Sequence, residues 1–311
     1  LEVTVPDDGD WGLRGTFRNM AVAAVEGAPS GSGLDGYLET GPREGRVTLE
    51  NGPARIGFPE LFHTDWRFRK LAGRVHWARR SDGWEVAARR LVGEHEGMQA
   101  SGGFRLRLHE GSSDTLSLRV GIAGGRTSML GRFVPRKRVP PELYSFLTEA
   151  VGSGTVTRGW YYGHGDIGGD DSDEAAGNRA FTSSMAYRFR ETELTYNPEW
   201  PTLESAAGRV QVQGDEGHIQ LDEGVVGGVE LEPSQVRVTG NRGEGLRVDV
   251  DTGARREGEL LTEQWRSSPL ADIAGGWLAD LRVTGSNHVD LSLSLWPDQA
   301  RDPKVGIGFS L

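Results

Sequence analysis

Apolar and polar residues alternate one by one along much of the chain, which is the period of a β-strand with one apolar and one wet face. The clearest stretches are 104–108, 116–120, 209–212, 236–238, 246–250 and 291–295. Short turn sequences such as Ser81-Asp82-Gly83 and Asn241-Arg242-Gly243 suit tight connections between antiparallel neighbours. The pattern predicts a mainly β protein built as a meandering antiparallel sheet.

Two segments have helical spacing instead. Prolines open the segment 140–152, apolar residues recur three to four positions apart within it, and Gly152 closes it. In the segment 268–278, Ser268 suits an N-cap and Pro269 a first helical position. We expect two short amphipathic helices.

The chain contains an internal repeat. Ala72-Gly73-Arg74-Val75 recurs as Ala207-Gly208-Arg209-Val210, and prolines, tryptophans and turns follow in the same order around both copies. Repeats of this kind decide the architecture before any motif does. The repeat predicts two units, residues 1–152 and 153–311, each of several strands ending in a short helix, in one continuous sheet without a linker.

Composition narrows the function classes. With 35 Lys+Arg against 45 Asp+Glu, the 311-residue chain carries a net charge of −10, which argues against nucleic-acid binding. The absence of cysteine excludes disulfides and thiolate metal sites. No apolar run approaches the roughly 18 residues of a membrane span, and no signal peptide is evident. We interpret the sequence as a piece of a longer protein and expect any anchor or targeting segment to lie outside it.

Catalytic and cofactor motifs are lacking. No phosphate-binding loop, nucleophile elbow, zinc-binding helix motif or dinucleotide fingerprint occurs, and the seven histidines stand singly. We interpret the Asp-rich stretch 166–174 as a solvated loop, the basic stretch 132–138 as a solvated rim, and most of the nine tryptophans as core or sheet anchors. The chain is therefore predicted to have no catalytic residue, metal or cofactor and not to be an enzyme.

The apolar strand faces need a cover, because two short helices cannot cover so many strands. Either two sheets face each other in a sandwich or barrel, or the sheet curls into an open trough filled by a molecule that is not protein. A large exposed apolar surface usually marks a binding site.

Several stretches resemble the YhdP-type proteins of the AsmA-like superfamily, which is similar to the bridge-like lipid transfer proteins. The resemblance runs from about Trp11 to Trp296 and rests on residues 59–62 with 71–77 and 82–84, on 134–147, on Leu194-Thr195-Tyr196-Asn197-Pro198-Glu199-Trp200-Pro201-Thr202-Leu203, and on 267–270 with 281–285. Residues 163–177 depart from the family pattern, so no role is carried over to them.

The resemblance implies a periplasmic, inner-membrane-anchored protein. In that family, repeated β units form a long taco-shaped groove along which phospholipid passes toward the outer membrane, supporting its barrier. The implied partners are phospholipids, together with the inner and outer membranes through parts of the protein outside this chain.

The first hypothesis is thus a strongly curved antiparallel sheet whose hydrophobic groove shields acyl chains. The inward, lipid-binding residues are expected to be Leu106, Leu108, Leu116, Leu118, Val120, Val210, Val212, Val236, Val238, Val248, Val250, Leu291, Leu293 and Leu295. Two alternatives stay open: a carbohydrate-binding or hydrolytic β-sandwich, and a structural periplasmic spacer. Unpaired sheet edges further predict edge-to-edge self-association of the chain.

Overall fold

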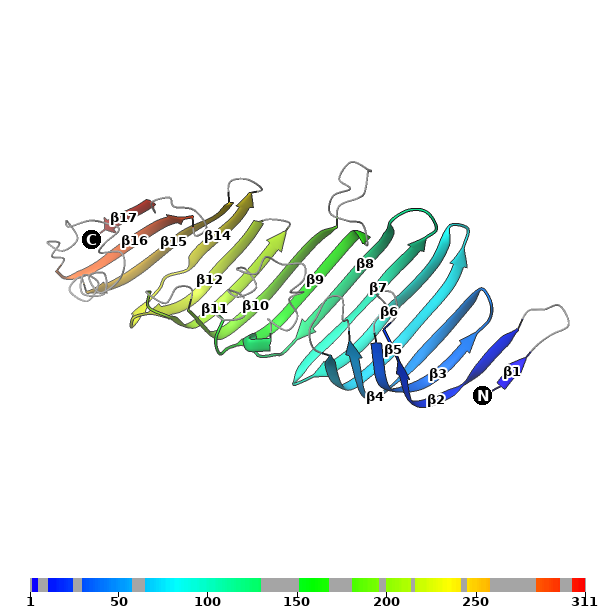
Figure 1. The fold of residues 1–311 in the computed structure, drawn as a ribbon. Coiled ribbons are helices and arrows are strands. Elements are labelled where there is room, and N and C mark those ends of the chain that lie inside the picture. The colour runs from blue at the N-terminus through cyan, green and yellow to red at the C-terminus, as the bar shows by residue number, and fades with distance from the viewer. Residues whose placement is uncertain are drawn as a thin grey trace. The chain divides into compact units, whose positions relative to one another are not determined.

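The computed structural model describes most of the chain and shows almost only strands (Figure 1). The described residues are 2–4, 11–24, 30–57, 65–129, 151–167, 181–195, 200–213, 216–241, 245–257, 284–296 and 304–310. The two predicted helices, at 140–152 and 268–278, fall almost wholly outside these ranges. Within the described residues, no helix has the length and apolar character that crossing a bilayer would require.

Seventeen strands lie in the described ranges. They are β1 (Glu2–Thr4), β2 (Gly12–Val22), β3 (Ser30–Thr40), β4 (Glu44–Gly57), β5 (Trp66–Arg80), β6 (Gly83–His95), β7 (Met98–His109), β8 (Asp114–Ala123), β9 (Thr155–Ile167), β10 (Thr182–Leu194), β11 (Leu203–Gln213), β12 (Glu216–Val226), β13 (Val229–Glu230), β14 (Ser234–Asn241), β15 (Gly245–Glu257), β16 (Ser286–Leu295) and β17 (Lys304–Ser310).

The chain divides into two compact units. Unit 1 comprises Leu1–Gly125, Arg132–Pro140 and Arg158–Ser184, and unit 2 comprises Arg126–Gly131, Pro141–Thr157 and Met185–Leu311. In unit 1 each strand from β1 to β9 pairs antiparallel with the next one along the chain. In unit 2 the same holds from β11 to β17, with the two-residue β13 set beside the end of β12, which also pairs with β14. The predicted antiparallel meander is confirmed, and the predicted boundary after residue 152 stays a prediction.

A line of register breaks crosses unit 1. Successive pairs from β2–β3 to β6–β7 lose their register at neighbouring points, which are Phe17/Met20/Val22, Ser32/Gly36, Leu49/Gly52/Ala54, Ala72/Val75 and Ala88/Leu91. Asn19 takes a positive φ of 50° at this line, and its N–H donates to Asp35 Oδ1 at 2.6 Å. Because each bulge bends its strand, an aligned series of them folds the sheet, and Figure 1 shows the strands of this unit turning back at their lower ends.

The core of unit 1 lies inside this bend. Leu34, Ala54 and Leu71 are buried there, and residues from before and after the breaks pack on them, including Phe17 and Phe68. Contact between apolar side chains on both sides of the bend requires the apolar face to be the inner one. Burial of this cluster therefore stabilises the curvature.

Unit 2 also has a register break beside a buried apolar cluster, formed by different residues. The β11–β12 pair breaks register between Glu204, Ala207 and Gly208, and Ser205 has a φ of 51°. Leu203, Ala206 and Leu221 form a buried cluster at that point, and Val229 with Val289 forms a second one. The four-residue repeat thus lies at a register break in both copies, in β5 at Gly73 and in β11 at Gly208.

Gly73 tests the importance of the bend. It has a φ of 152°, and a Cβ there would lie 2.8 Å from the Arg90 carbonyl oxygen and 2.7 Å from Leu91 Cδ2. We expect Gly73→Ala to lower the free energy of unfolding by about 1–3 kcal/mol, because the strained backbone and the fixed carbonyl leave no room for the methyl group. Urea unfolding measures the loss.

Gly12→Ala is the matched control. No heavy atom lies within 4 Å of its Cβ position, so the change should stay within about 0.5 kcal/mol. Equal losses for the two variants would contradict the role given to the bend.

Candidate functional site

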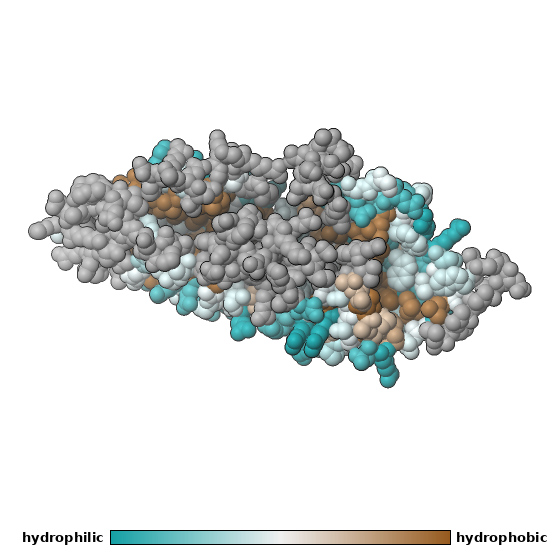
Figure 2. All heavy atoms as spheres, viewed as in Figure 1, coloured by the Kyte–Doolittle hydropathy of each residue, from teal (hydrophilic) through white to brown (hydrophobic). Residues whose placement is uncertain are grey.

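One face of the unit 1 sheet is apolar across many strands. Residues directly opposite each other in an antiparallel pair point to the same face. One such row runs Val47, Val75, Ala88, Phe104 and Leu118 across β4 to β8, and the next runs Gly45, Trp77, Val86, Leu106 and Leu116. Figure 2 shows apolar surface gathered over this region.

The structure brings the predicted residues of unit 1 onto this face. Leu106 is opposite Leu116, while Leu118 and Val120 follow on the same side of β8. All four are partly buried, and Leu108, near the turn, is 38% exposed.

The predicted residues of unit 2 also share one face. Rows of directly paired residues run Val210, Ile219, Val236, Val250, Leu293 and Val305, then Val212, Gly217, Val238, Val248 and Leu295. Leu291 lies in the adjoining row with Thr252 and Ile307. Val210 and Leu293 are buried, and the other predicted residues of this unit are partly buried.

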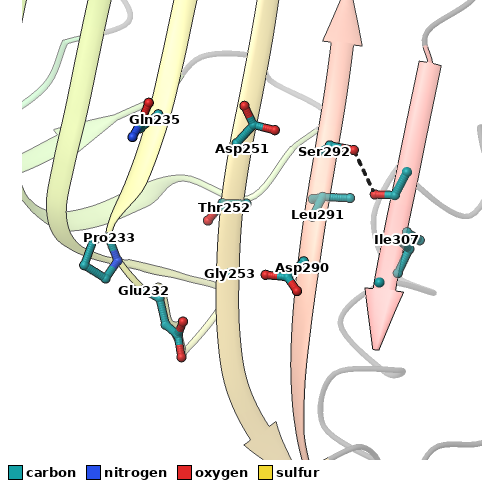
Figure 3. A pocket seen from close by; sticks show the side chains of 12 residues that line it. Glu232, Pro233, Gln235, Asp251, Thr252, Gly253, Asp290, Leu291, Ser292 and Ile307 are labelled. Carbon is teal, nitrogen blue, oxygen red and sulfur yellow. Dashed lines mark hydrogen bonds between the residues drawn. The ribbon is translucent and has the colours of Figure 1, made fainter. Parts of the chain in front are cut away.

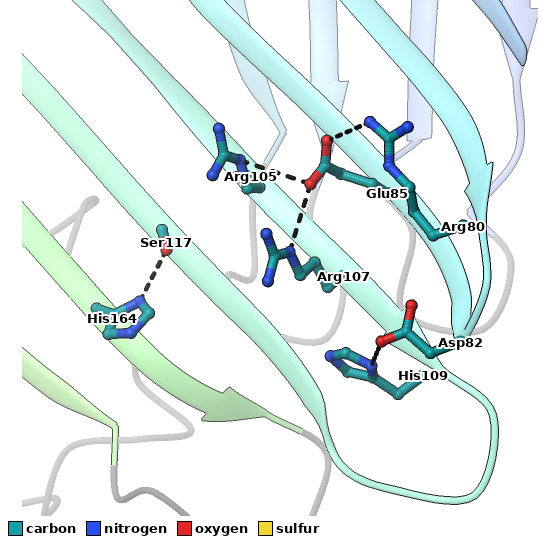
Figure 4. A network of polar contacts seen from close by, with 8 residues as sticks. All are labelled: Arg80, Asp82, Glu85, Arg105, Arg107, His109, Ser117 and His164. Carbon is teal, nitrogen blue, oxygen red and sulfur yellow. Dashed lines mark hydrogen bonds and ion pairs between the residues drawn. The ribbon is translucent and has the colours of Figure 1, made fainter.

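The opposite face of unit 1 is charged. Glu85, whose side chain is 11% exposed, accepts hydrogen bonds from Arg80 Nη2 at 3.0 Å and Arg107 Nε at 3.3 Å, with Arg105 Nε at 3.7 Å (Figure 4). The hydrogen bond from Arg80 lowers the pKa of Glu85 below its usual 4.5 and, with the other arginines, outweighs the opposing effect of burial. Three strands are thereby joined through one carboxylate.

The opposite face of unit 2 has an equivalent contact. Burial alone would raise the pKa of Asp249. Hydrogen bonds from Ser294 Oγ, at 2.6 Å, and from Arg247 have a larger opposite effect, so the pKa lies below its usual value. Arg247 and Lys304 lie 5.7 and 5.9 Å from the ring of Trp296, which is only 8% exposed. Two cationic side chains therefore lie against the Trp296 ring on the charged face of the sheet.

A hollow of about 540 Å³ opens in unit 2 near Gly253 (Figure 3). Asp251 and Asp290 point into it, and glycines on β15 and β17 leave its floor bare. Its side chains are mainly polar, and their register places it on the charged side of the sheet. Of the predicted groove-lining residues, only Leu291 also borders this hollow.

Two tyrosine hydroxyls are held neutral. Burial raises the pKa of Tyr187 to about 12, and burial also raises that of Tyr161, partly offset by a hydrogen bond with Ser183. Tyr161 is opposite Val120 on the apolar face. Neither phenol introduces a charge beside the apolar residues at physiological pH.

Two polar residues considered in the sequence, His164 and Asp166, form ordinary cross-strand pairs. Ser117 Oγ lies 2.7 Å from His164 Nδ1 on the open charged face (Figure 4). Of the Asp-rich stretch 166–174, the structure describes residues 166 and 167, and Asp166 accepts a hydrogen bond from Thr115 Oγ1 at 3.4 Å. The basic stretch 132–138 lies outside the described residues.

The fold and its surface define a class of protein, the repetitive antiparallel β proteins in which each unit has one apolar and one charged face. In unit 1 a bend places the apolar face on the inside. The comparison with known families agrees with the resemblance noted in the sequence. The chain belongs to the YhdP family, whose model, described as YhdP protein, matches residues 1–305.

One relative of the chain has a name that states its function. The chain is 19% identical over 267 residues to the intermembrane phospholipid transporter YhdP of Escherichia coli (strain K12). The match covers 86% of this chain and 21% of that protein, so the chain corresponds to a limited part of its relative. No solved structure matches the chain.

The charged face makes a testable contribution to stability. Because the pKa of Glu85 is lower in the folded protein than its usual 4.5, its ionised form stabilises the fold above that pH, and this stabilisation is lost as the pH falls through the folded pKa. We expect Glu85→Gln to cost about 1 kcal/mol near neutral pH and to remove part of the acid-dependent loss. Urea unfolding across an acidic pH series measures both effects.

Glu39→Gln is the control for this variant. Glu39 also pairs with an arginine, Arg46, but both side chains are about half exposed at 47% and 51%. Its loss should be smaller. If Glu85→Gln leaves the pH profile of stability unchanged, the network does not have the role assigned to it.

Proposed function

We propose that this chain is a lipid-conducting segment of an intermembrane phospholipid transporter, with acyl chains lying on the apolar faces of its units. The observation that carries the proposal is the incomplete burial of those faces. Only Val210 and Leu293 of the fourteen predicted lining residues are buried. The core between two packed sheets would bury most of them.

The shape of unit 1 suits such a ligand. The bend puts the apolar rows on the inside and the Glu85 network on the outside, so a lipid tail would contact side chains on more than one side. Directly paired rows give a continuous apolar path across β4 to β8, since each row is joined to the next by the register. A headgroup would remain at the strand ends, where the turns are polar.

The energetics explain why a path of this kind is needed. Each buried CH₂ contributes roughly 0.8 kcal/mol, so two acyl chains of ordinary length exposed to water would cost on the order of 20 kcal/mol. A surface that keeps the tails out of water removes most of that cost at every point of the journey. The chain's motifs offer no nucleotide hydrolysis, and the direction of movement would be set by other components.

Family membership and the phospholipid-transporter name of the Escherichia coli relative support this proposal. The wider context belongs to the proposal as well, because the chain spans 21% of that relative's length. We infer a periplasmic location, with the inner and outer membranes contacted through other parts of the full-length protein. The role inferred for this chain is to bind and guide lipid, without catalysis.

Lipid retention by the purified chain is the direct test. Native mass spectrometry combined with lipid extraction should show phospholipid at a defined stoichiometry. A protein that carries no lipid under gentle conditions, and takes up none from vesicles of phosphatidylethanolamine and phosphatidylglycerol, would contradict the proposal.

Charges placed on the apolar face should block binding while leaving the fold intact. We expect Leu118→Asp or Val212→Asp to reduce bound phospholipid roughly tenfold, because a carboxylate in contact with acyl chains loses its hydration. Circular dichroism and urea unfolding should change little, since these positions are partly open to solvent in the lipid-free state.

Neighbours on the charged face provide the controls. Ser117→Asp and Gln211→Asp introduce the same charge one residue away on the other side of the sheet, and both should retain lipid. Unfolding of the two apolar-face variants by several kcal/mol would instead indicate a closed core and would refute the open groove.

A further inference from the structure

Three of the most exposed apolar side chains lie on the charged face of unit 1. Val92, Trp160 and Tyr162 are 49%, 48% and 45% exposed. Val92 is opposite Ser101 on β7, and Trp160 and Tyr162 are opposite Gly121 and Arg119 on β8. This register places all three on the side away from Leu118 and Val120. The groove proposal gives these residues no role.

Small residues separate them and form a shallow floor. One directly paired row runs Val92, Ser101, Gly121 and Trp160 across β6 to β9. In the next row Gly103 is opposite Arg119, and a Cβ on Gly103 would lie 3.0 Å from Arg89 Cα. Neighbouring strands are about 4.8 Å apart, so the floor between Val92 and Trp160 is about 14 Å wide. An extended peptide segment fits in that width.

Arginines surround this floor. Arg89, Arg119 and Arg158 are exposed, and no hydrogen bond or ion pair joins their side chains to the rest of the described chain. By contrast, Arg69 pairs with Glu94, and the arginines around Glu85 share its carboxylate. In a protein with a net charge of −10, this is a local excess of unneutralised positive charge.

We propose that the outer patch, defined as Arg89, Val92, Arg119, Arg158, Trp160 and Tyr162, is a docking site for an acidic segment of another protein. Trp, Tyr and Arg are the residue types that contribute most to binding at protein interfaces. Carboxylates pair with arginine through strong, directional hydrogen bonds. The exposed rings and Val92 add apolar contact area beside those charges. The patch lies on the opposite side of the sheet from the proposed lipid path, so both sites can be occupied at once.

Site-specific crosslinking in the intact full-length protein tests this proposal. A photo-reactive p-benzoylphenylalanine replaces Gln99, an exposed residue of the same face in the row that leads to Arg158, so the patch itself stays unaltered. Irradiation of the producing cells should join this position to a different protein, and mass spectrometry should place the joined peptide in a segment rich in Asp and Glu.

Patch variants decide whether the contact is specific. We expect Trp160→Ala with Tyr162→Ala, and separately Arg119→Glu, to reduce the adduct roughly tenfold. Arg18→Glu removes an exposed arginine of β2 outside the patch and should leave the adduct unchanged. All of these variants should retain phospholipid in native mass spectrometry, so failure of the docking site and failure of lipid binding are distinguishable.

Four outcomes would overturn the proposal: no adduct, an adduct that the patch variants do not reduce, an adduct to a glycan or lipid, or an adduct to a second copy of this chain.

Discussion

The rest of the structure depends on the register between neighbouring strands. Side chains alternate with a period of two, so a slip of one residue would turn a whole strand's apolar residues to the wet side. Pairs such as Leu106 with Leu116 and Val236 with Val250 are held in phase by backbone hydrogen bonds. The same phase gathers Arg80, Arg105 and Arg107 around Glu85 on the other face. The apolar surface and the ionic network are therefore two results of one alignment.

Curvature adds a second requirement, because a flat sheet with one apolar face would expose that face fully. The aligned register breaks solve this locally. At these breaks a few residues of each strand lose their regular pairing. The resulting bend brings Phe17 and Phe68 into contact with the buried cluster of Leu34, Ala54 and Leu71. Burial in that cluster offsets the lost ladder contacts, while the predicted lining residues of unit 1 are only partly buried or exposed.

The alternation in the sequence was sufficient to predict the antiparallel meander and to identify residues such as Leu118 and Val212 that share a face with their neighbours. It could not predict where the strands break register, because Asn19 and Ser205, which have positive φ at the breaks of β2 and β11, are not glycines. It also could not identify the outward position of Trp160. In Gly159-Trp160-Tyr161-Tyr162-Gly163 aromatic residues lie on both faces of the strand, and glycines lie on the apolar face. The alternation of apolar and polar residues therefore does not indicate which face of this strand is the apolar one. The Glu85 network depends on residues from three strands, which only the register brings together.

The neighbour-to-neighbour pairing of the strands also governs how such a sheet is made. Among the described residues, the strand pairs join segments that follow one another in the chain, so little loop-closure entropy is lost when each new hairpin adds to those already formed. A sheet of this topology can grow strand by strand as the polypeptide emerges, from the N-terminal end onward. It can likewise be lengthened during evolution by duplicating a hairpin, because an added strand needs only the edge before it to be complete.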